Sequence, residues 1–198
     1  MATPRRVVLA TGNAGKLREF SALLAPLGLQ VISQASLGIA PAEETGDTFE
    51  ANALLKARHA AHAAGLPALA DDSGIEVEAL DGRPGVFSAR YAGPAASDAD
   101  NNALLLAELA AQPAGARRAR YRCVIAFVRS GDDSAPLLAR GSWEGHIATA
   151  PAGEGGFGYD PLFIPEGLQV TAAQLDPAAK NALSHRGQAL AALLQLMR

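Results

Sequence analysis

The sequence predicts an α/β fold in which helices flank a mixed β-sheet. Apolar segments typical of buried strands alternate with segments whose apolar residues recur at helical spacing, an order typical of parallel strands joined by helices. Two long strand-like segments, 118–129 and 137–148, are separated by a polar turn, which predicts an antiparallel hairpin reaching out from the sheet. The 198 residues contain no internal repeat and no low-complexity linker, so residues 1–198 are predicted to form a single domain.

Composition argues against several classes of protein. The net charge of -3 and the isoelectric point near 5.8 argue against binding of a nucleic acid polymer through a broad basic surface. The apolar stretch after Arg5 and Arg6 is too short for a signal peptide, and no segment suggests a membrane span. Cys123 is the single cysteine, which excludes an intrachain disulfide and suits a reducing compartment. We therefore expect a cytoplasmic protein.

The first strand, 6–10, is followed by a loop of small residues, Thr11-Gly12-Asn13-Ala14-Gly15-Lys16, and then by a helix. Backbone N–H groups at the start of a helix favour an anion, and Lys16 adds a positive charge. The loop is not of the Walker A type, because Leu17 stands where Ser or Thr is needed. The segment therefore predicts either an anion site or a simple turn from strand to helix.

A second strand, 29–33, precedes a helix predicted over 49–64. Asp47 and Glu50 have the spacing of a capping box at the start of this helix, and Gly65 is expected to end it.

Two sets of side chains on this helix bear on function. Lys56 is one turn from Asn52, and it can reach back toward the preceding acidic loop, 43–50. His59 and His62 are three residues apart and share a helix face. They predict either a metal pair or, as we prefer, part of a solvated basic face.

The segment Asp71-Asp72-Ser73-Gly74 follows the apolar residues 68–70 and precedes a second strand predicted over 75–80. Two neighbouring carboxylates repel each other, and a divalent cation or a proton relieves the repulsion. Asp, Ser and Gly are also ordinary turn residues. Taken alone, the segment supports a metal site and a polar turn equally.

Phe157 lies in a glycine-rich segment, 151–163, and has no apolar partner at helix or strand spacing. An aromatic ring presented from a flexible backbone suits stacking on a flat ligand. The alternative is a glycine-rich turn with the Phe157 ring tucked beneath it.

Capping residues predict the remaining helices. Ser97 with Asp100 begins a helix to about residue 112, and Asp176-Pro177 begins a short helix. Ser184 caps a last helix that continues to residue 197.

His185 and Arg186 fall in the first turn of that last helix. The helix dipole disfavours cationic side chains there, so a compensating anion or carbonyl group is expected.

Acids, cations and an aromatic ring together suit a magnesium nucleotide. Carboxylates hold the metal, lysines and backbone N–H groups hold phosphates, and the ring stacks on the base. No Ser/His/Asp or Cys/His nucleophile set stands out, and Cys123 in an apolar strand is interpreted as structural. Hydrolysis by an activated water is the simplest chemistry.

Six segments carry a more specific signal. They are Thr11-Gly12-Asn13 through Lys16, Glu43-Glu44-Thr45-Gly46, Ala70-Asp71-Asp72-Ser73-Gly74, Pro84-Gly85-Val86-Phe87-Ser88-Ala89-Arg90-Tyr91, Gly156-Phe157-Gly158-Tyr159-Asp160-Pro161 and Ser184-His185-Arg186. In this order they resemble the motifs of the non-canonical purine nucleoside triphosphate pyrophosphatases, the inosine/xanthosine triphosphatase family. The resemblance runs from Val7 to about Leu196. One departure is Ala51, near which many relatives carry a second acid.

The resemblance implies hydrolysis of ITP, dITP and XTP to the nucleoside monophosphate and pyrophosphate, with Mg²⁺ as cofactor. It also implies a homodimer of elongated α/β subunits, each built around a long mixed sheet. No membrane and no nucleic acid polymer is expected as a partner. The alternatives are a nucleotide-binding sensor without catalysis and a related pyrophosphatase of modified pyrimidine nucleotides.

The resemblance further implies roles for single residues. Asp72 is the catalytic candidate, as the base for water, and it would bind the metal together with Glu44, for which Glu43 is the alternative. The phosphates would contact Thr11, Gly12, Asn13, Ala14, Gly15, Lys16 and Lys56. Ser73 would be a further substrate contact. The nucleoside pocket would be lined by Phe157, Gly158, Tyr159, Asp160, Lys180, His185 and Arg186.

Overall fold

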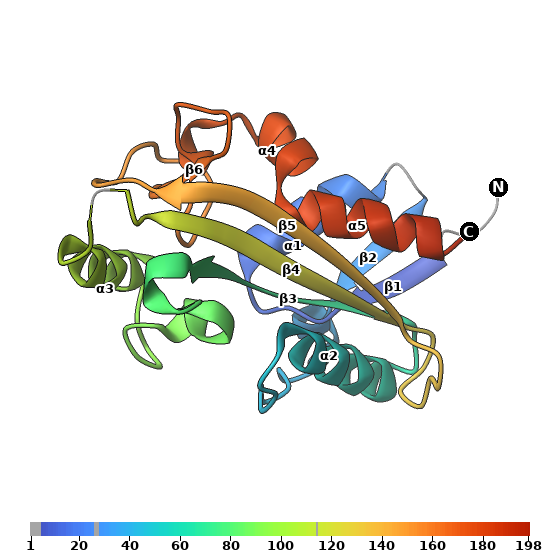
Figure 1. The fold of residues 1–198 in the computed structure, drawn as a ribbon. Helices are drawn as coiled ribbons and strands as arrows, with labels where there is room; N and C mark the ends of the chain where they lie inside the picture. The colour runs from blue at the N-terminus through green and yellow to red at the C-terminus, as the bar shows by residue number, and fades with distance from the viewer. Residues whose placement is uncertain (1–4, 26–27, 114) are drawn as a thin grey trace. The chain divides into compact units, whose positions relative to one another are not determined.

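The computed structural model describes residues 5–25, 28–113 and 115–198. Its centre is a six-stranded sheet with the strand order β2-β1-β3-β4-β5-β6 (Figure 1). Strand β1 pairs in parallel with β2 and β3, whereas β5 and β6 are antiparallel, so the sheet is mixed. The predicted α/β fold class is therefore confirmed. The strands are β1 (Arg5–Leu9), β2 (Leu29–Ser33), β3 (Ala68–Val77), β4 (Arg118–Val128), β5 (Leu137–Ile147) and β6 (Phe163–Pro165).

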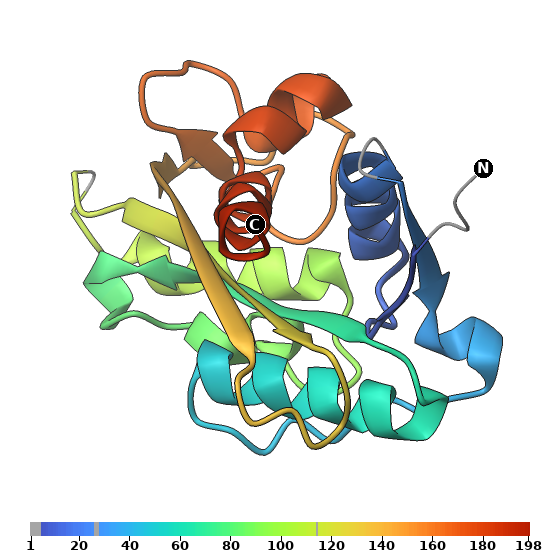
Figure 2. The ribbon, with the colours of Figure 1, turned by 90° about the vertical axis from the view of Figure 1, so that its right-hand side faces the viewer.

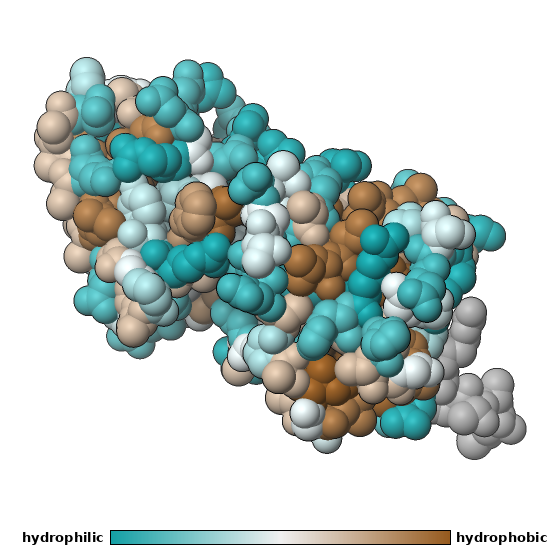
Figure 3. Space-filling view, turned by 90° about the horizontal axis from the view of Figure 1, so that it is seen from below, coloured by the Kyte–Doolittle hydropathy of each residue, from teal (hydrophilic) through white to brown (hydrophobic). Residues whose placement is uncertain are grey.

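Helices form where capping residues precede apolar periodicity. They are α1 (Ala14–Leu24), α2 (Phe49–Ala64), α3 (Asp98–Ala110), α4 (Pro177–Leu183) and α5 (His185–Leu196). Short 3-10 helices are η2 (Gln34–Leu37), η3 (Glu78–Leu80), η4 (Gly85–Arg90) and η5 (Ala172–Gln174). No helix in the described ranges is long and apolar enough to cross a membrane. Hydrophilic residues are spread over the face shown in Figure 3, between smaller hydrophobic areas.

The chain divides into two compact units. The first comprises Met1–Asp72, Cys123–Arg140 and Ala189–Arg198, and the second comprises Ser73–Arg122 and Gly141–Gln188. Strands β3, β4 and β5 each contribute residues to both units. The single domain predicted from the chain length stays a prediction.

In the first unit, alternate residues of β1 face two different layers. Val7 and Leu9 pack with Phe20 of α1 and Leu190 of α5. Successive side chains of a strand point to opposite faces, so β1 has a second face to cover. Helix α2 lies on that side of β1 (Figure 2). Cys123 is buried in this core, as expected for a structural cysteine.

The second unit has its own core, which is richer in aromatic rings. Tyr121 of β4 meets Phe163 of β6 edge-on, with 4.8 Å between ring centroids, and Trp143 of β5 packs against the same ring at 5.4 Å. These contacts hold β6 to the sheet. The sequence did not predict this three-residue strand.

The structure confirms most helix boundaries and corrects one cap. Ser97 and Asp100 form the predicted capping box of α3, and Asp176 caps α4. At the start of α2, however, the capping side chain is Thr48, which accepts from the N–H of Ala51, and not Asp47. Thr48 is one residue closer to the first helical residue, where its hydroxyl reaches the unsatisfied N–H group.

Strand β3 is longer than the sequence predicts. The sequence suggested a break at Asp71-Asp72-Ser73-Gly74, but one strand runs without interruption from Ala68 to Val77. The strand predicted over 75–80 ends at Val77 and continues as η3. Ala68 and Leu69 pair with Val8 and Leu9 of β1, and β4 is the neighbour of β3 on its other side. Membership of the sheet on both sides overrides the local turn preference.

Strands β4 and β5 form the predicted hairpin, since they are neighbours in the sheet and are joined by the turn 129–136. The prediction that this hairpin reaches out from the sheet is wrong, because both strands are members of the sheet and β6 pairs with β5. In the first half of β4, arginines alternate with buried residues, so they lie on the more exposed face of the strand. Arg120 pairs with Glu76 at 2.7 Å, and Arg118 lies 3.9 Å from Glu78.

Candidate active site

Two groups of residues carry the predicted chemistry, one in each unit. The lysine–carboxylate cluster of the first unit consists of Lys16, Glu44, Asn52, Lys56, Asp71 and Asp72. The aromatic cluster of the second unit consists of Tyr121, Phe157, Asp160, Lys180, His185 and Arg186.

The neighbouring acids Asp71 and Asp72 point to opposite faces of β3, because side chains alternate along a strand. Oδ2 of Asp71 lies 2.9 Å from Nζ of Lys16 in the first turn of α1. Oδ1 of Asp72 lies 2.7 Å from Nζ of Lys56 on α2. The polar-turn interpretation of this segment is therefore wrong, and each carboxylate has its own ammonium group.

Lys56 links Asp72 to the acidic segment. Its Nζ atom lies 2.7 Å from Oε1 of Glu44 and 2.7 Å from Oδ1 of Asp72. Burial raises the pKa of Asp72, and the Lys56 ammonium offsets only part of that effect. Burial alone would lower the pKa of Lys56, but Asp72, Asp71 and Glu44 outweigh it and raise that pKa. Two carboxylate oxygens therefore converge on one cation.

The structure distinguishes Glu43 from Glu44. Glu44 is partly buried and contacts Lys56, whereas the Glu43 side chain is exposed. Of the two alternatives, Glu44 is the one that belongs to the lysine–carboxylate cluster.

Asn52 is a member of this cluster whose contacts the sequence did not reveal. Its side chain is fully buried in α2, and Nδ2 donates to Oδ2 of Asp72 at 3.3 Å. Its Oδ1 accepts from the backbone N–H of Gly46 at 2.8 Å. A Cβ atom at Gly46 would lie 2.7 Å from Asn52 Oδ1, so glycine is required for this close approach. The only signal in the sequence was the position of Asn52 one turn before Lys56.

The loop 11–16 forms the turn from β1 into α1. Asn13 caps the helix by accepting from the backbone N–H of Lys16 at 3.0 Å, and the Thr11 hydroxyl accepts from the N–H of Asn13 at 3.1 Å. Gly12, Asn13 and Ala14 are exposed, whereas Gly15 is buried. The helix N-terminus with its N–H groups is therefore accessible at this loop, as an anion site requires.

The donors of the cluster suit magnesium. In the described part of the chain, no group of three or more His, Cys, Asp and Glu side chains is gathered to hold a metal ion. Mg²⁺ is commonly held by one or two carboxylates, with substrate phosphates and water completing its octahedron. Glu44 and Asp72 already converge on a cation, the Lys56 ammonium, so this pair fits that kind of site.

His59 and His62 do not form a metal pair in the structure. Nε2 of His59 lies 2.9 Å from the carbonyl oxygen of Ala40, and His62 packs against Gly131 in the hairpin turn. Both histidines are exposed, which matches the preferred interpretation of a solvated face.

Asp160 is the centre of the aromatic cluster. Its carboxylate is buried, and Oδ2 accepts from Nζ of Lys180 at 2.6 Å and from the backbone N–H of Phe157 at 2.8 Å. Oδ1 accepts from the Tyr121 hydroxyl at 3.3 Å. A Cβ atom at Gly156 would overlap Asp160 Oδ2, so only glycine fits at this position of the loop.

Phe157 is half-buried and lies beside two cations. Nζ of Lys180 is 4.9 Å from its ring centroid, and Cζ of Arg186 is 5.6 Å away. Both distances are within the range of cation–π attraction. Arg186 also donates to the Ser73 hydroxyl at 3.0 Å, so Ser73 is in contact with the start of α5.

The two residues after Phe157 are held by different parts of the second unit. The N–H of Gly158 donates to Asp98 at 2.6 Å, and its carbonyl accepts from Asn102 at 2.9 Å. The Tyr159 side chain lies in the core and donates to the carbonyl of Ser88 at 2.8 Å.

His185 begins α5 and is buried. Its imidazole stacks on the ring of Tyr121, with 4.5 Å between centroids and an interplanar angle of 5°. Tyr121 was not predictable as a site residue from the sequence, because a tyrosine that alternates with arginines in a strand has the pattern of an ordinary core residue.

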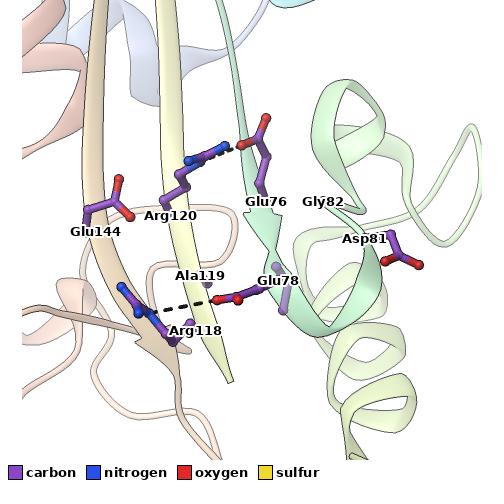
Figure 4. A pocket seen from close by; sticks show the side chains of 9 residues that line it. Glu76, Glu78, Asp81, Gly82, Arg118, Ala119, Arg120 and Glu144 are labelled. Carbon is purple, nitrogen blue, oxygen red and sulfur yellow. Dashed lines mark hydrogen bonds and ion pairs between the residues drawn. The ribbon is translucent and has the colours of Figure 1, made fainter. Parts of the chain in front are cut away.

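The second unit also has a cavity of about 420 Å³ that is lined by none of the residues of the aromatic cluster (Figure 4). Charged side chains from β3, β4 and β5 line this cavity. Its arginines face its glutamates, and Arg120 forms an ion pair with Glu76 at 2.7 Å. None of the predicted site residues lines it. The volume of this cavity therefore does not make it the predicted site.

Comparisons with known proteins agree with the motifs. The profile of the Ham1 family matches residues 7–196. The chain is 60% identical over 197 residues to a dITP/XTP pyrophosphatase of Bordetella pertussis, covering 98% of this chain and 92% of the relative. It is 57% identical over 194 residues to a dITP/XTP pyrophosphatase of Methylococcus capsulatus, with coverage of 98% and 96%.

Solved structures show the same fold. A HAM1 protein from Coxiella burnetii is 50% identical, and it superposes with a TM-score of 0.89 over 98% of both chains. The Staphylococcus aureus Ham1 protein is 42% identical, with a TM-score of 0.83 over 98% of this chain and 97% of that one. The predicted family is thereby confirmed, and the chain belongs to the Ham1 family.

Proposed function

We propose that this protein hydrolyses non-canonical purine nucleoside triphosphates, namely ITP, dITP and XTP, to the monophosphate and pyrophosphate. Relatives that are 57% and 60% identical over nearly the whole chain are named dITP/XTP pyrophosphatases. The structural observation that carries the proposal is the convergence of Glu44 and Asp72 on Lys56, each at 2.7 Å. This is the arrangement of charges that a metal-bound triphosphate needs.

The proposed cofactor is Mg²⁺, held by Glu44 and Asp72. When bound, it would neutralise phosphate charge and polarise the phosphorus under attack.

Asp72 is the proposed base for the attacking water. Burial raises its pKa, which makes its carboxylate a stronger base than an exposed aspartate. Asn52 and Lys56 each contact one of its oxygens, so the carboxylate is oriented from two sides. Lys16, Lys56 and the N–H groups at the start of α1 offset the charge that grows on the departing pyrophosphate.

The aromatic cluster supplies the proposed nucleoside contacts. Phe157 would stack on the base, and the side chains of His185 and Arg186 would donate to the 6-oxo group that hypoxanthine and xanthine share. Adenine carries a 6-amino donor at that position, so the same donors would stay unpaired, at a cost of about 1 to 3 kcal/mol for each buried group.

Release of pyrophosphate from a substrate panel tests the function. With magnesium present, ITP, dITP and XTP should be turned over well ahead of ATP and the pyrimidine nucleotides. No pyrophosphate from any of the three would overturn the enzyme proposal and favour a non-catalytic sensor. Turnover of dTTP or UTP well ahead of ITP would instead favour a pyrophosphatase of pyrimidine nucleotides.

Two further properties implied by the resemblance are also proposals. A homodimer would show twice the mass of one chain in light scattering, and a monomeric mass at assay concentration would refute it. The cytoplasmic location is tested by fractionation of the native cells.

A further inference from the structure

We propose that Tyr121 is a positioning residue that sets the choice between 6-oxo and 6-amino purines by fixing the plane of His185. The inference rests on the proposed function, in which His185 donates to the 6-oxo group. Tyr121 would act through His185 and through Asp160, without touching the substrate.

Stacking on Tyr121 fixes the plane of the His185 ring. The rings of Tyr121 and His185 are nearly parallel, at 5°, and their centroids are 4.5 Å apart. The N–H groups of an imidazole donate only in the plane of the ring, so a neighbour that fixes this plane also fixes the direction of the hydrogen bond. A ring that can tilt would accommodate a 6-amino group at less cost.

Tyr121 is itself immobilised by the residues around it. Its side chain is buried, and the Phe163 ring meets it edge-on at 4.8 Å. Its hydroxyl donates to Asp160 Oδ1 at 3.3 Å. Burial and the neighbouring Asp160 carboxylate raise the pKa of Tyr121 well above its ordinary value, so the hydroxyl remains a donor.

The Tyr121 side chain contacts both halves of the proposed base site. Through its ring, Tyr121 contacts the first residue of α5, His185. Through its hydroxyl, it reaches Asp160, whose other oxygen holds the backbone N–H of Phe157 at 2.8 Å. The plane of the donor ring and the position of the stacking ring are therefore set by the same residue.

Two substitutions separate these contributions. Tyr121→Phe keeps the stack and loses only the hydroxyl bond. We expect it to leave the ratio of kcat/KM for ITP to that for ATP within about 3-fold of the wild type. Tyr121→Leu removes the stack, and we expect that ratio to fall by about 10-fold or more, the scale on which a buried hydrogen bond discriminates. Tyr121→Met fills more of the volume and replaces the leucine variant if that variant does not fold.

Trp143→Leu is the matched control. Trp143 is a buried aromatic that packs on Phe163 in the same core, and the described contacts give it no role at His185. It should lower thermal stability as Tyr121→Leu does, while the ITP-to-ATP ratio stays at the wild-type value.

The outcomes distinguish the inference from the function on which it rests. If the wild type releases no pyrophosphate from ITP, the proposed function fails. The inference is then decided by calorimetric binding of IMP and AMP to the wild type and the Tyr121 variants. If the wild type is active but Tyr121→Leu lowers turnover of ITP and ATP in parallel, as a structural role predicts, the inference is overturned.

Discussion

Lys56 and Asp72 form a buried ion pair with 2.7 Å between Nζ and Oδ1, and the same ammonium contacts Glu44. The pair connects the middle of α2 to the centre of β3. Removing one member of such a pair leaves the other charge without compensation in a poorly solvated place. Much of what can be tested about the lysine–carboxylate cluster follows from this arrangement.

Replacement of Lys56 should abolish most activity. Lys56→Met leaves Glu44 and Asp72 facing each other and removes a positive charge from the phosphate side. We expect kcat/KM for ITP to fall by about 100-fold or more, the usual cost of losing one preorganised electrostatic group. The control is Arg58→Met on the same helix, whose guanidinium contacts the carbonyl of Asp133 and which should retain activity. Comparable losses in both variants would show damage to α2 rather than to the site.

Asn52→Ala should weaken the binding of magnesium to the enzyme by more than the loss of stability alone would explain. The substitution frees Asp72 Oδ2 and the N–H of Gly46, and we expect a loss of about 2 kcal/mol in unfolding free energy. The magnesium concentration for half-maximal activity should rise several-fold.

Asn101→Ala provides a matched control for that experiment. Asn101 is another buried helical asparagine, which accepts from the N–H of Ala92 at 2.8 Å and donates to the carbonyl of Ala89 at 3.3 Å. It should cost similar stability and leave the magnesium requirement unchanged. Equal magnesium requirements for the two variants would show that Asn52 does not support magnesium binding.

Phe157→Ala should raise KM for ITP and reduce kcat/KM by about 10- to 100-fold, since stacking of a base on an aromatic ring contributes about 1 to 3 kcal/mol. Phe87→Ala is the comparison, because Phe87 is 56% exposed and its ring also lies beside an arginine, Arg90 at 5.2 Å. A steady-state titration with ITP measures both. An unchanged KM in Phe157→Ala would contradict stacking.

Tyr91 should make stability depend on pH in the alkaline range. Its hydroxyl donates to Glu108, and burial together with this carboxylate raises the pKa of Tyr91 to about 12. Because the folded pKa exceeds the unfolded value, the stabilisation is fully present below about pH 10 and is lost as the pH rises through about 12.

Urea unfolding at pH 9 and pH 11.5 measures this effect. Tyr91→Phe should lower the unfolding free energy by about 1 kcal/mol at pH 9, a modest value because the side chain is partly exposed. The difference from the wild type should shrink at pH 11.5. Glu108→Gln should lower the pKa of Tyr91 in a spectrophotometric titration, and an unchanged titration would refute the role of that carboxylate.

Features that depend on local chemistry were predictable from the sequence. The caps of α3 and α4 and the glycine that ends α2 involve residues a few positions apart, so their spacing alone indicates them. Membership of the family was likewise visible, because its motifs are short segments in a fixed order.

Features that depend on distant contacts were not predictable. Asp, Ser and Gly favour turns, yet 71–74 stays extended within β3, which lies between β1 and β4 in the sheet, and both neighbouring strands are distant from it in the sequence. In the sequence, Asn52 resembles an ordinary helix residue and Tyr121 an ordinary strand residue. Only the fold shows that Asn52 contacts Asp72 and that Tyr121 stacks on His185. The roles of the site residues themselves stay predictions that the experiments above can test.

The uninterrupted path of β3 has a consequence for insertions and deletions. Asp71 reaches Lys16 and Asp72 reaches Lys56 because the two acids have opposite parity along the strand. Adding or removing one residue between Leu69 and Asp71 would send each carboxylate toward the other's lysine, whereas a change of two residues would restore the faces. Length variation close to these two acids should therefore be confined to the loop before β3, since a single-residue indel just before them within the strand exchanges the partners of both.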